Sequence, residues 1–287
     1  MGKLAFWAGI VVLALLCVVA VAWAIAYGGY RRSMADAERA WATIAAAAKP
    51  TQTTFDSAMI AGLPEVAQRY FNHAIAPGTA LGTTVELAMT GSFVLGSGAQ
   101  QTSFAMTARQ ILQPPTGFVW IANMRSGLMR MSGSDALLDT HGSMNFFMFK
   151  ALPLVRVASS EGLDRSAAVR PLLEAIWMPA GLLPANGARW EQVGGDRAKI
   201  SFGEGAAAIE MTMTLAKDGR VIEVVAPRWS DANPEKVFQI QPFGGTMEAE
   251  ATFAGYTIPS RVQVGNMFGT DAYLPFFNAT ITEARFY

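Results

Sequence analysis

The sequence predicts a mostly β protein of the α+β class, in which an N-terminal transmembrane helix precedes a curved antiparallel sheet, or half-barrel, with a few packing helices. Two observations carry this prediction. An uncharged apolar run occupies positions 4–30, and from position 83 onward apolar residues recur with a period of two between turn signals. The chain has 287 residues, of which 52% are hydrophobic and 15% charged. It is therefore long enough to bury a large core and too apolar for general disorder.

The charge balance and the scarcity of cysteine and histidine exclude several function classes. Lys and Arg together number 22, as do Asp and Glu, so the formal net charge is zero. Nucleic-acid binding needs a concentrated basic face instead. One Cys and two His exclude a disulfide framework and a zinc site built from several Cys and His ligands. We therefore expect no nucleic-acid partner, no metal and no cofactor.

Residues 1–30 are predicted to form a membrane anchor. No charged residue occurs from Leu4 to Tyr30. This run is longer than the apolar core of a secretory signal, which is roughly 7–15 residues, and it suffices for a spanning helix, which needs about 20. Aromatic residues near both ends of the run are expected at the two membrane interfaces. They are Trp7, Trp23 and Tyr27.

A cleaved signal peptide is the alternative, because Ala22-Trp23-Ala24 and Ala24-Ile25-Ala26 both match a small-x-small cleavage pattern. Lys3 flanks one end of the apolar run and Arg31 and Arg32 flank the other, so the charge count is balanced or slightly favours a cytoplasmic C-terminal domain. A short N-terminal anchor before one large domain more often leaves that domain outside the cytoplasm. We therefore expect a single-pass protein of the bacterial inner (cytoplasmic) membrane with a periplasmic, extracytoplasmic C-terminal domain.

Residues 31–61 are predicted to be a juxtamembrane helix and a linker. Gly28-Gly29 is expected to loosen the chain where it leaves the membrane. A new helix is then expected over Ser33–Lys49, because its first residues resemble a capping box. Pro50 is expected to end this helix, and Thr51–Ile60 to be the linker.

Residues 62–287 are predicted to form an antiparallel β domain with helices. Leu63-Pro64 is expected to start one helix and Pro77-Gly78 to stop it. Strands follow, and a second helix is expected near Asp164–Trp177, with Pro171 at a kink or at a helix start. The candidate strands of the second half are Arg189–Phe202, Ala207–Leu215, Arg220–Ala226, Gly245–Phe253, Thr257–Val264 and Phe277–Phe286.

The strands of the first half are apolar on both faces. Between Thr84 and Phe149 six of 66 residues are charged, against fifteen of 48 between Arg189 and Lys236. An antiparallel sheet commonly keeps one face polar, so both faces of these strands must be covered. The helix that contains Trp177 is expected to cover one face. An apolar ligand, a membrane surface, a protein partner or a second sheet are the candidates for the other, beside an ordinary core filled with methionine.

Methionine and aromatic residues are frequent in the same strands, which suits an adaptable apolar cavity. The Trp177 helix is expected to be the lid of this cavity. The candidate residues for a hydrophobic-ligand site, or for an interface, are Phe104, Trp120, Met129, Phe146, Met148 and Trp177.

The sequence offers no candidate for a catalytic site. His73 and His141 have no Ser or Cys nucleophile in a recognised arrangement, and no Gly-x-Ser-x-Gly nucleophile elbow is present. Asp135 and Asp139 are expected to cap turns, because glycine residues lie near them. We therefore expect no catalytic residue and no enzymatic activity.

Three segments resemble a family of uncharacterised bacterial membrane-anchored proteins, and together they span most of the chain after Gly62. They are Leu63-Pro64-Glu65-Val66 with Arg69-Tyr70 and His73, Trp177-Met178-Pro179 with Leu182-Leu183-Pro184, and Gly255-Tyr256-Thr257-Ile258-Pro259. The family has no established activity and implies no catalytic residues. Its pattern of sheet and helices is similar to the curved half-barrels of periplasmic lipoprotein carriers, which is an analogy of fold alone.

Two functions fit these expectations. In the first, a non-enzymatic, membrane-anchored extrinsic domain binds a hydrophobic ligand, such as a lipid or the acyl chain of a lipoprotein, near the bilayer. In the second, the chain is a structural accessory subunit that stabilises or scaffolds an integral-membrane complex, for example a respiratory or photosynthetic assembly. Small residues in the anchor would then permit close helix contact. Co-purified lipid would indicate the first function, and stable co-migration with other membrane proteins the second.

Overall fold

The computed structural model describes most of the chain, namely residues 2–48, 52–96, 100–205 and 208–287. The predicted end of the juxtamembrane helix at Lys49 and Pro50 lies outside the described residues, as does Thr51 at the start of the predicted linker.

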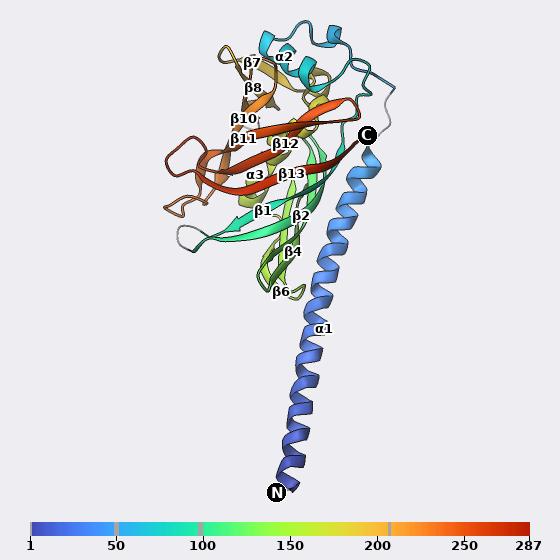
Figure 1. Ribbon diagram of the computed structural model, residues 1–287, viewed down its shortest axis with the longest axis vertical. Helices are drawn as coiled ribbons and strands as arrows, with labels where there is room; N and C mark the ends of the chain where they lie inside the picture. The colour runs from blue at the N-terminus through green and yellow to red at the C-terminus, as the bar shows by residue number, and fades with distance from the viewer. Residues whose placement is uncertain (1, 49–51, 97–99, 206–207) are drawn as a thin grey trace.

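The first element, α1 (Gly2–Ala47), is one continuous helix, and its N-terminal half projects away from the rest of the molecule (Figure 1). The predicted loosening of the chain at Gly28-Gly29 and the predicted start of a new helix at Ser33 are therefore wrong. Each glycine weakens a helix by about 1 kcal/mol, and the packing of the following turns against the sheet offsets this cost. By length and composition α1 is able to cross a membrane, and its most apolar part is fully exposed.

All strands in the described residues belong to one antiparallel sheet of 13 strands, which confirms the predicted mostly β class. Their bounds are β1 (Val85–Leu95), β2 (Thr102–Gln113), β3 (Gly117–Ser126), β4 (Met129–Leu138), β5 (His141–Met148), β6 (Leu152–Val157), β7 (Arg189–Gln192), β8 (Arg197–Phe202), β9 (Ile209–Leu215), β10 (Val221–Ser230), β11 (Gln239–Phe253), β12 (Tyr256–Asn266) and β13 (Leu274–Phe286). The sheet is open, with β6 and β7 at its edges, and consists of two meanders, β1–β6 and β7–β13. The meanders join where β1 pairs with β13.

Short helical turns connect the edge strand β6 with the opposite edge strand β7. We call residues 161–186 the crossing segment, because they pass over one face of the sheet and contact strands of both meanders. Its pieces are α3 (Glu161–Ala168), α4 (Arg170–Leu173), η3 (Glu174–Trp177), η4 (Pro179–Leu182) and η5 (Pro184–Asn186). The single helix predicted near Asp164–Trp177 is thus three short pieces. Pro171 lies at the start of the second, where its missing N–H is tolerated.

Two further short elements precede the sheet. The 3₁₀ turn η1 (Ser57–Ile60) lies within the predicted linker. The helix α2 (Glu65–Ala74) begins directly after Pro64, as predicted, and its buried residues pack against the main core. Both elements lie at the end of the domain that is far from the N-terminus of α1 (Figure 1).

Alternate residues of β3 lie on the two faces of the sheet. Phe118 and Trp120 belong to the main core on the side of the crossing segment, which we call the inner face. Val119 and Ile121 lie on the outer face, in a second apolar cluster with residues of α1. The chain itself therefore covers both faces, which explains why these strands are apolar on both sides.

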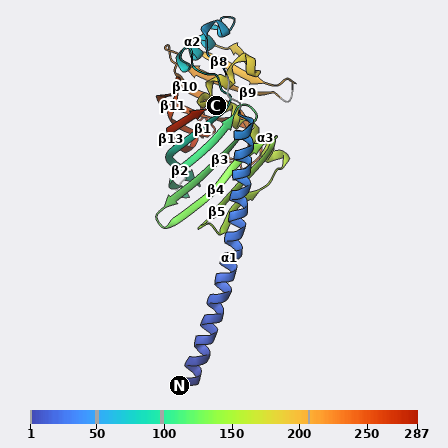
Figure 2. The same ribbon diagram turned by 90° about the vertical axis from the view of Figure 1, so that its right-hand side faces the viewer.

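The C-terminal part of α1 covers the outer face of β2, β3 and β4 (Figure 2). Ile44 is buried in the outer cluster. Trp41 donates its indole N–H to Glu86 at 3.2 Å, and the Arg109 guanidinium lies 4.4 Å from the centre of the Trp41 ring and pairs with Glu38. The covers considered from the sequence for this second face were a ligand, a membrane, a partner and a second sheet. None of these four covers the outer face of β2, β3 and β4 in the structure. The C-terminal part of α1 covers it instead.

Candidate functional site

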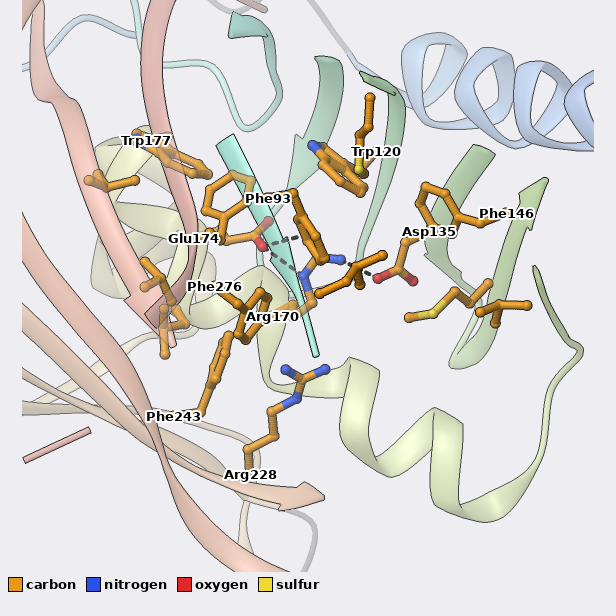
Figure 3. A pocket seen from close by; sticks show the side chains of 18 of the residues that line it. Phe93, Trp120, Asp135, Phe146, Arg170, Glu174, Trp177, Arg228, Phe243 and Phe276 are labelled. Carbon is orange, nitrogen blue, oxygen red and sulfur yellow. Dashed lines mark hydrogen bonds and ion pairs between the residues drawn. The ribbon is translucent and has the colours of Figure 1, made fainter. Parts of the chain in front are cut away.

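An apolar pocket of about 240 Å³ lies between the inner face of the sheet and the crossing segment (Figure 3). Strands of both meanders contribute to its lining, together with α4 and η3. Of its 22 lining residues, four are charged and 18 are apolar. The apolar ones are Phe93, Leu95, Trp120, Met124, Met131, Met144, Phe146, Leu154, Val155, Leu173, Ile176, Trp177, Phe243, Met247, Val262, Val264, Phe276 and Phe277.

Aromatic rings surround Trp120 on one wall of the pocket. The centre of its ring system lies 6.1 Å from that of Phe93, 5.9 Å from that of Phe146 and 6.1 Å from that of Phe277. The indole Nε1 of Trp120 is buried and has no hydrogen-bond partner among the described residues. Leaving a buried donor unpaired costs about 1–3 kcal/mol. The wall around Trp120 therefore contains one polar group that the described residues leave unpaired.

Arg170 lies between two carboxylates in the lining (Figure 3). Its Nη1 is 2.6 Å from Asp135 Oδ2, and its Nη2 is 2.7 Å from Glu174 Oε1. Gln110 donates a hydrogen bond of 2.6 Å to the other oxygen of Glu174. The Arg170 guanidinium also lies 4.0 Å from the centre of the Phe118 ring. Both carboxylates of the lining are therefore bound within the protein.

Burial and pairing shift the ionisation of this group in opposite directions. Burial raises the pKa of Asp135 above its ordinary value, although the nearby charges of Arg170 and Arg228 lower it in part. Burial alone lowers the pKa of Arg170, but the charges of Glu174 and Asp135 outweigh this effect and raise the pKa. Arg170 therefore stays charged and serves as the counter-ion of both carboxylates.

Arg228 brings a second guanidinium to the pocket (Figure 3). Its Nε donates to the carbonyl oxygen and to the hydroxyl oxygen of Ser166, each at 3.1 Å, and its Cζ lies 4.4 Å from the centre of the Phe243 ring. Within the part of the chain that the structure describes, no carboxylate forms an ion pair with it. Burial, followed by the charge of Arg170, lowers the pKa of Arg228 to about 10. At neutral pH it is therefore a cation without a counter-ion in contact.

Three of the six residues predicted for a ligand site line this pocket: Trp120, Phe146 and Trp177. Trp177 is 3% exposed, and its Nε1–H donates a hydrogen bond of 3.0 Å to the carbonyl oxygen of Pro259. This bond fastens the crossing segment to β12 beside the pocket.

The other three predicted residues lie elsewhere. Phe104 is buried in the main core, outside the lining. Met129 begins β4 and Met148 ends β5, so both lie next to hairpin turns. The period of a strand tells which face a residue occupies, but not how far along the strand a pocket extends. The predicted anchor residues Trp7, Trp23 and Tyr27 are exposed on α1.

Sequence reasoning missed the charged part of the lining, namely Arg170, Glu174 and Arg228. The interpretation of Asp135 as a turn cap is wrong, because this residue lies within β4 and its carboxylate is buried on the inner face. Two signals were present. Arg170 and Glu174 are four residues apart, a spacing at which opposite charges pair on a helix. Asp135 is the single charged residue among the inner-facing positions of β4.

A polar cluster outside the pocket joins the start of β5 to α3. Ser159 donates its hydroxyl proton to Asp164 Oδ2 at 2.7 Å, and Asp164 Oδ1 accepts the backbone N–H of Gly142 at 2.6 Å. The Nδ1 of His141 lies 2.9 Å from the Ser159 hydroxyl oxygen. Since the serine proton goes to the aspartate, the histidine does not act on it as a base. In the described ranges, no group of three or more His, Cys, Asp and Glu side chains could hold a metal ion.

Comparison with known proteins identifies a family and two structures. Residues 53–279 match the family described as "Family of unknown function (DUF6544)", which confirms the predicted resemblance to an uncharacterised family. A domain described as an outer membrane lipoprotein-sorting protein, from Vibrio parahaemolyticus, is 8% identical with a TM-score of 0.37, over 77% of this chain and 91% of that one. A LolA superfamily protein from Nitrosomonas europaea is 7% identical with a TM-score of 0.37, over 77% of this chain and 92% of that one. No curated protein matches the sequence.

Proposed function

We propose that this chain, which belongs to the DUF6544 family of unknown function, binds the acyl chain of a lipid-like molecule in the pocket on the inner face of its sheet. In this proposal the protein is a non-enzymatic binding module that acts beside a membrane. The ligand is a lipid or the acyl chain of a lipoprotein.

The apolar lining of the pocket is the observation that carries the proposal. Four of the 18 apolar residues are methionines, whose flexible side chains adapt to the shape of a chain. Drug-sized ligands occupy pockets of roughly 300–1,000 Å³, so about 240 Å³ suits one acyl chain better than a diacyl lipid. Burial of roughly ten methylene groups at about 0.8 kcal/mol each contributes about 8 kcal/mol before entropy losses.

The exposed apolar surface of α1 supports a location at the membrane. We place the anchor at residues 1–30, the juxtamembrane part at 31–61 and the β domain at 62–287, on the periplasmic side of the bacterial inner membrane. Trp7 and Tyr27 are 20 residues apart on one continuous helix, which corresponds to about 30 Å. This is about the thickness of the hydrocarbon core of a bilayer, so the two residues would reach its two interfaces.

Native mass spectrometry of the full-length protein in mild detergent, with lipid extraction alongside, tests this function. We expect one lipid-like molecule per chain in the wild type. Trp120→Arg places a charge in the wall of the pocket, and Met144→Trp fills the pocket without adding a charge, so both should remove the ligand. Val193→Arg adds the same charge at an exposed turn outside the lining and should retain it.

A wild-type chain that carries no lipid and runs in a fixed ratio with other membrane proteins would contradict this function. It would support the accessory-subunit function instead. Circular dichroism of each variant separates loss of the ligand from loss of the fold. Intact mass also shows whether the N-terminal segment is retained, since a cleaved signal peptide would remove the anchor.

A further inference from the structure

We propose that Arg228 binds the ionised head group of the ligand, so that the pocket selects a single-chain amphiphile that carries a carboxylate or a phosphate at one end. This inference rests on the proposed function, because it assumes that an acyl chain occupies the apolar part of the pocket. It specifies that the head group of the ligand is negatively charged, which the apolar lining alone does not determine.

The distribution of charges in the lining points to an anion. Asp135 and Glu174 both bind Arg170, at 2.6 Å and 2.7 Å, so their oxygens are already in use. Arg228 uses its Nε for Ser166 and rests on the ring of Phe243. Across the described ranges its two Nη atoms have no ion-pair partner. Among the described lining residues, Arg228 is the cation without a contacting counter-ion, and it is therefore the group on which an entering anion would bind.

The chemistry of arginine defines the class of head group. A guanidinium presents parallel N–H donors that match the two oxygens of a carboxylate or a phosphate. A neutral alcohol offers one acceptor and no charge, and a quaternary ammonium group would be repelled. Trp120, whose indole N–H is buried without a partner among the described residues, is also a lining residue of the pocket. An amphiphile with acceptor oxygens can satisfy donors that a plain hydrocarbon leaves unpaired.

Competition between chains of equal length tests this assignment. The full-length protein is delipidated in detergent and given equal amounts of hexadecanoate, hexadecyl phosphate and 1-hexadecanol, and native mass spectrometry measures the ratio of the three complexes. The variant is Arg228→Gln. The matched control is Arg165→Gln, because Arg165 also stacks on an aromatic ring, that of Trp229, but lies outside the lining.

We expect the wild type and Arg165→Gln to prefer an anionic chain over the alcohol by about tenfold or more, since a hydrogen bond to a charged group contributes at least that much. Arg228→Gln should bind the three chains about equally. The ratio of hexadecanoate to hexadecyl phosphate in the wild type identifies which anion the site prefers. Equal binding of all three chains by the wild type would overturn the role of Arg228 and leave the acyl-chain function intact. Absence of binding of every chain would overturn the function itself.

A second inference concerns the surface formed by two hairpin turns near α1. Leu128 in the turn between β3 and β4 is 89% exposed, and Phe149 and Leu152 around the turn between β5 and β6 are 43% and 55% exposed. We call these three residues the hairpin tips. Single exposed apolar residues are common, whereas these three gather at two neighbouring turns.

Along the axis of α1, the hairpin tips lie near the C-terminal end of its uncharged run, which ends at Tyr30. Gly117 at the start of β3 lies next to Ile44, while Phe147 near the end of β5 contacts Tyr30 with a ring distance of 5.5 Å. The hairpins therefore point toward the N-terminal half of α1, as Figure 1 shows. Phe149 lies two residues beyond Phe147, about 7 Å along a strand. This distance equals about five residues of helix, so the tips lie near the level of Ile25 and Ala26.

The charges around the hairpin tips match an anionic surface. The segments 117–134 and 141–160 contain no Asp or Glu. The exposed basic residues close to the tips and on the adjacent turn of α1 are Arg31, Arg32, Arg125, Arg130 and Lys150. Basic residues next to anionic lipid head groups strengthen the attachment of a protein surface to a bilayer. We infer that the hairpin tips rest on the anionic surface of the bilayer that α1 crosses, which rests on the anchor in the proposed function.

Fluorescence quenching in lipid nanodiscs tests this contact. Leu128→Cys and, as a control at the far end of the domain, the half-exposed Met59→Cys are made in a Cys17→Ser background and labelled with a small fluorophore. We expect lipids with a bromine near the head group to quench the label at position 128 and not the label at position 59. Reversing two charges with Arg130→Glu and Lys150→Glu should reduce quenching in discs that contain phosphatidylglycerol. Equal quenching at positions 128 and 59 would overturn the contact.

Discussion

The indole N–H of Trp177 donates a hydrogen bond of 3.0 Å to the carbonyl oxygen of Pro259, and this bond joins the crossing segment to the inner face of the sheet. Both groups are buried. The crossing segment is therefore a fixed wall of the pocket at this point. The half-exposed lining residues Leu95 and Leu154 mark the side from which a ligand can enter.

Replacing Trp177 with Phe keeps an aromatic ring at this position but removes the donor. We expect Trp177→Phe to lower the free energy of unfolding by about 1–3 kcal/mol, because the Pro259 carbonyl is left buried without a partner. Chemical denaturation measures the change. Trp229→Phe, at a partly exposed position on β10, is the control and should change stability less. An equal loss in both variants would mean that ring size, and not the hydrogen bond, stabilises the segment.

Arg228 should reduce the stability of the ligand-free protein. Burial lowers its pKa to about 10, which means that the surroundings disfavour the charged form. Replacement of this half-buried charge, which has no ion-pair partner among the described residues, by an apolar side chain of similar length removes this penalty. We expect Arg228→Met to raise the free energy of unfolding by roughly 1–2 kcal/mol. A decrease, with Arg165→Met unchanged, would show that the hydrogen bonds to Ser166 outweigh the cost of burying the charge.

The end of α1 should contribute to folding, and its beginning should not. Ile44 is 2% exposed in the outer cluster, while Ile25 on the same helix is 72% exposed. We expect Ile44→Ala to lower the free energy of unfolding by about 2–4 kcal/mol and Ile25→Ala to change it by less than about 0.5 kcal/mol. Both variants are measured by denaturation of the full chain in the same detergent. A similar effect of the two changes would contradict the docking of α1 on the sheet.

The Asp164 carboxylate should make stability depend on acid. The backbone N–H of Gly142, and then the hydroxyl of Ser159, lower the pKa of Asp164 below its ordinary value. A carboxylate with a lowered folded-state pKa stabilises the fold above its unfolded-state pKa, and this stabilisation is lost as the pH falls through the folded-state value. We expect Asp164→Asn to lower the melting temperature at pH 7 and to match the wild type near pH 2. A difference that persists unchanged at low pH would exclude the ionised carboxylate as its source.

Much of the fold follows from local patterns, because strand periodicity and turn residues act over short distances. Most strands of both meanders, the start of α2 after Pro64 and the apolar run of α1 are of this kind. The single candidate strand Arg189–Phe202 is instead the hairpin of β7 and β8, whose turn the sequence analysis missed. The continuity of α1 does not follow from local patterns. It depends on packing between Ile44 and a strand that lies about 75 residues later in the chain. The inference that both faces of the early strands are covered was correct. The identity of the second cover required the three-dimensional arrangement.

The candidate site also contains residues that local patterns predict and residues that only the folded chain brings together. Trp120 and Phe146 could be predicted because large apolar side chains alternate along β3 and β5. Arg170 pairs with Asp135 across 35 residues, and Arg228 reaches the same pocket from the other meander. No local spacing connects these charged residues, so the pairing that leaves Arg228 without a carboxylate is visible only in the folded chain.

Photo-crosslinking locates the ligand most directly. The full-length protein is mixed with hexadecanoate that carries a diazirine in its chain, irradiated, digested and sequenced by mass spectrometry. Binding in the pocket predicts labels on the lining residues Met124, Met131 and Met144, which excess hexadecanoate removes. Labels confined to the exposed apolar part of α1, with none on these methionines, would contradict the pocket as the binding site.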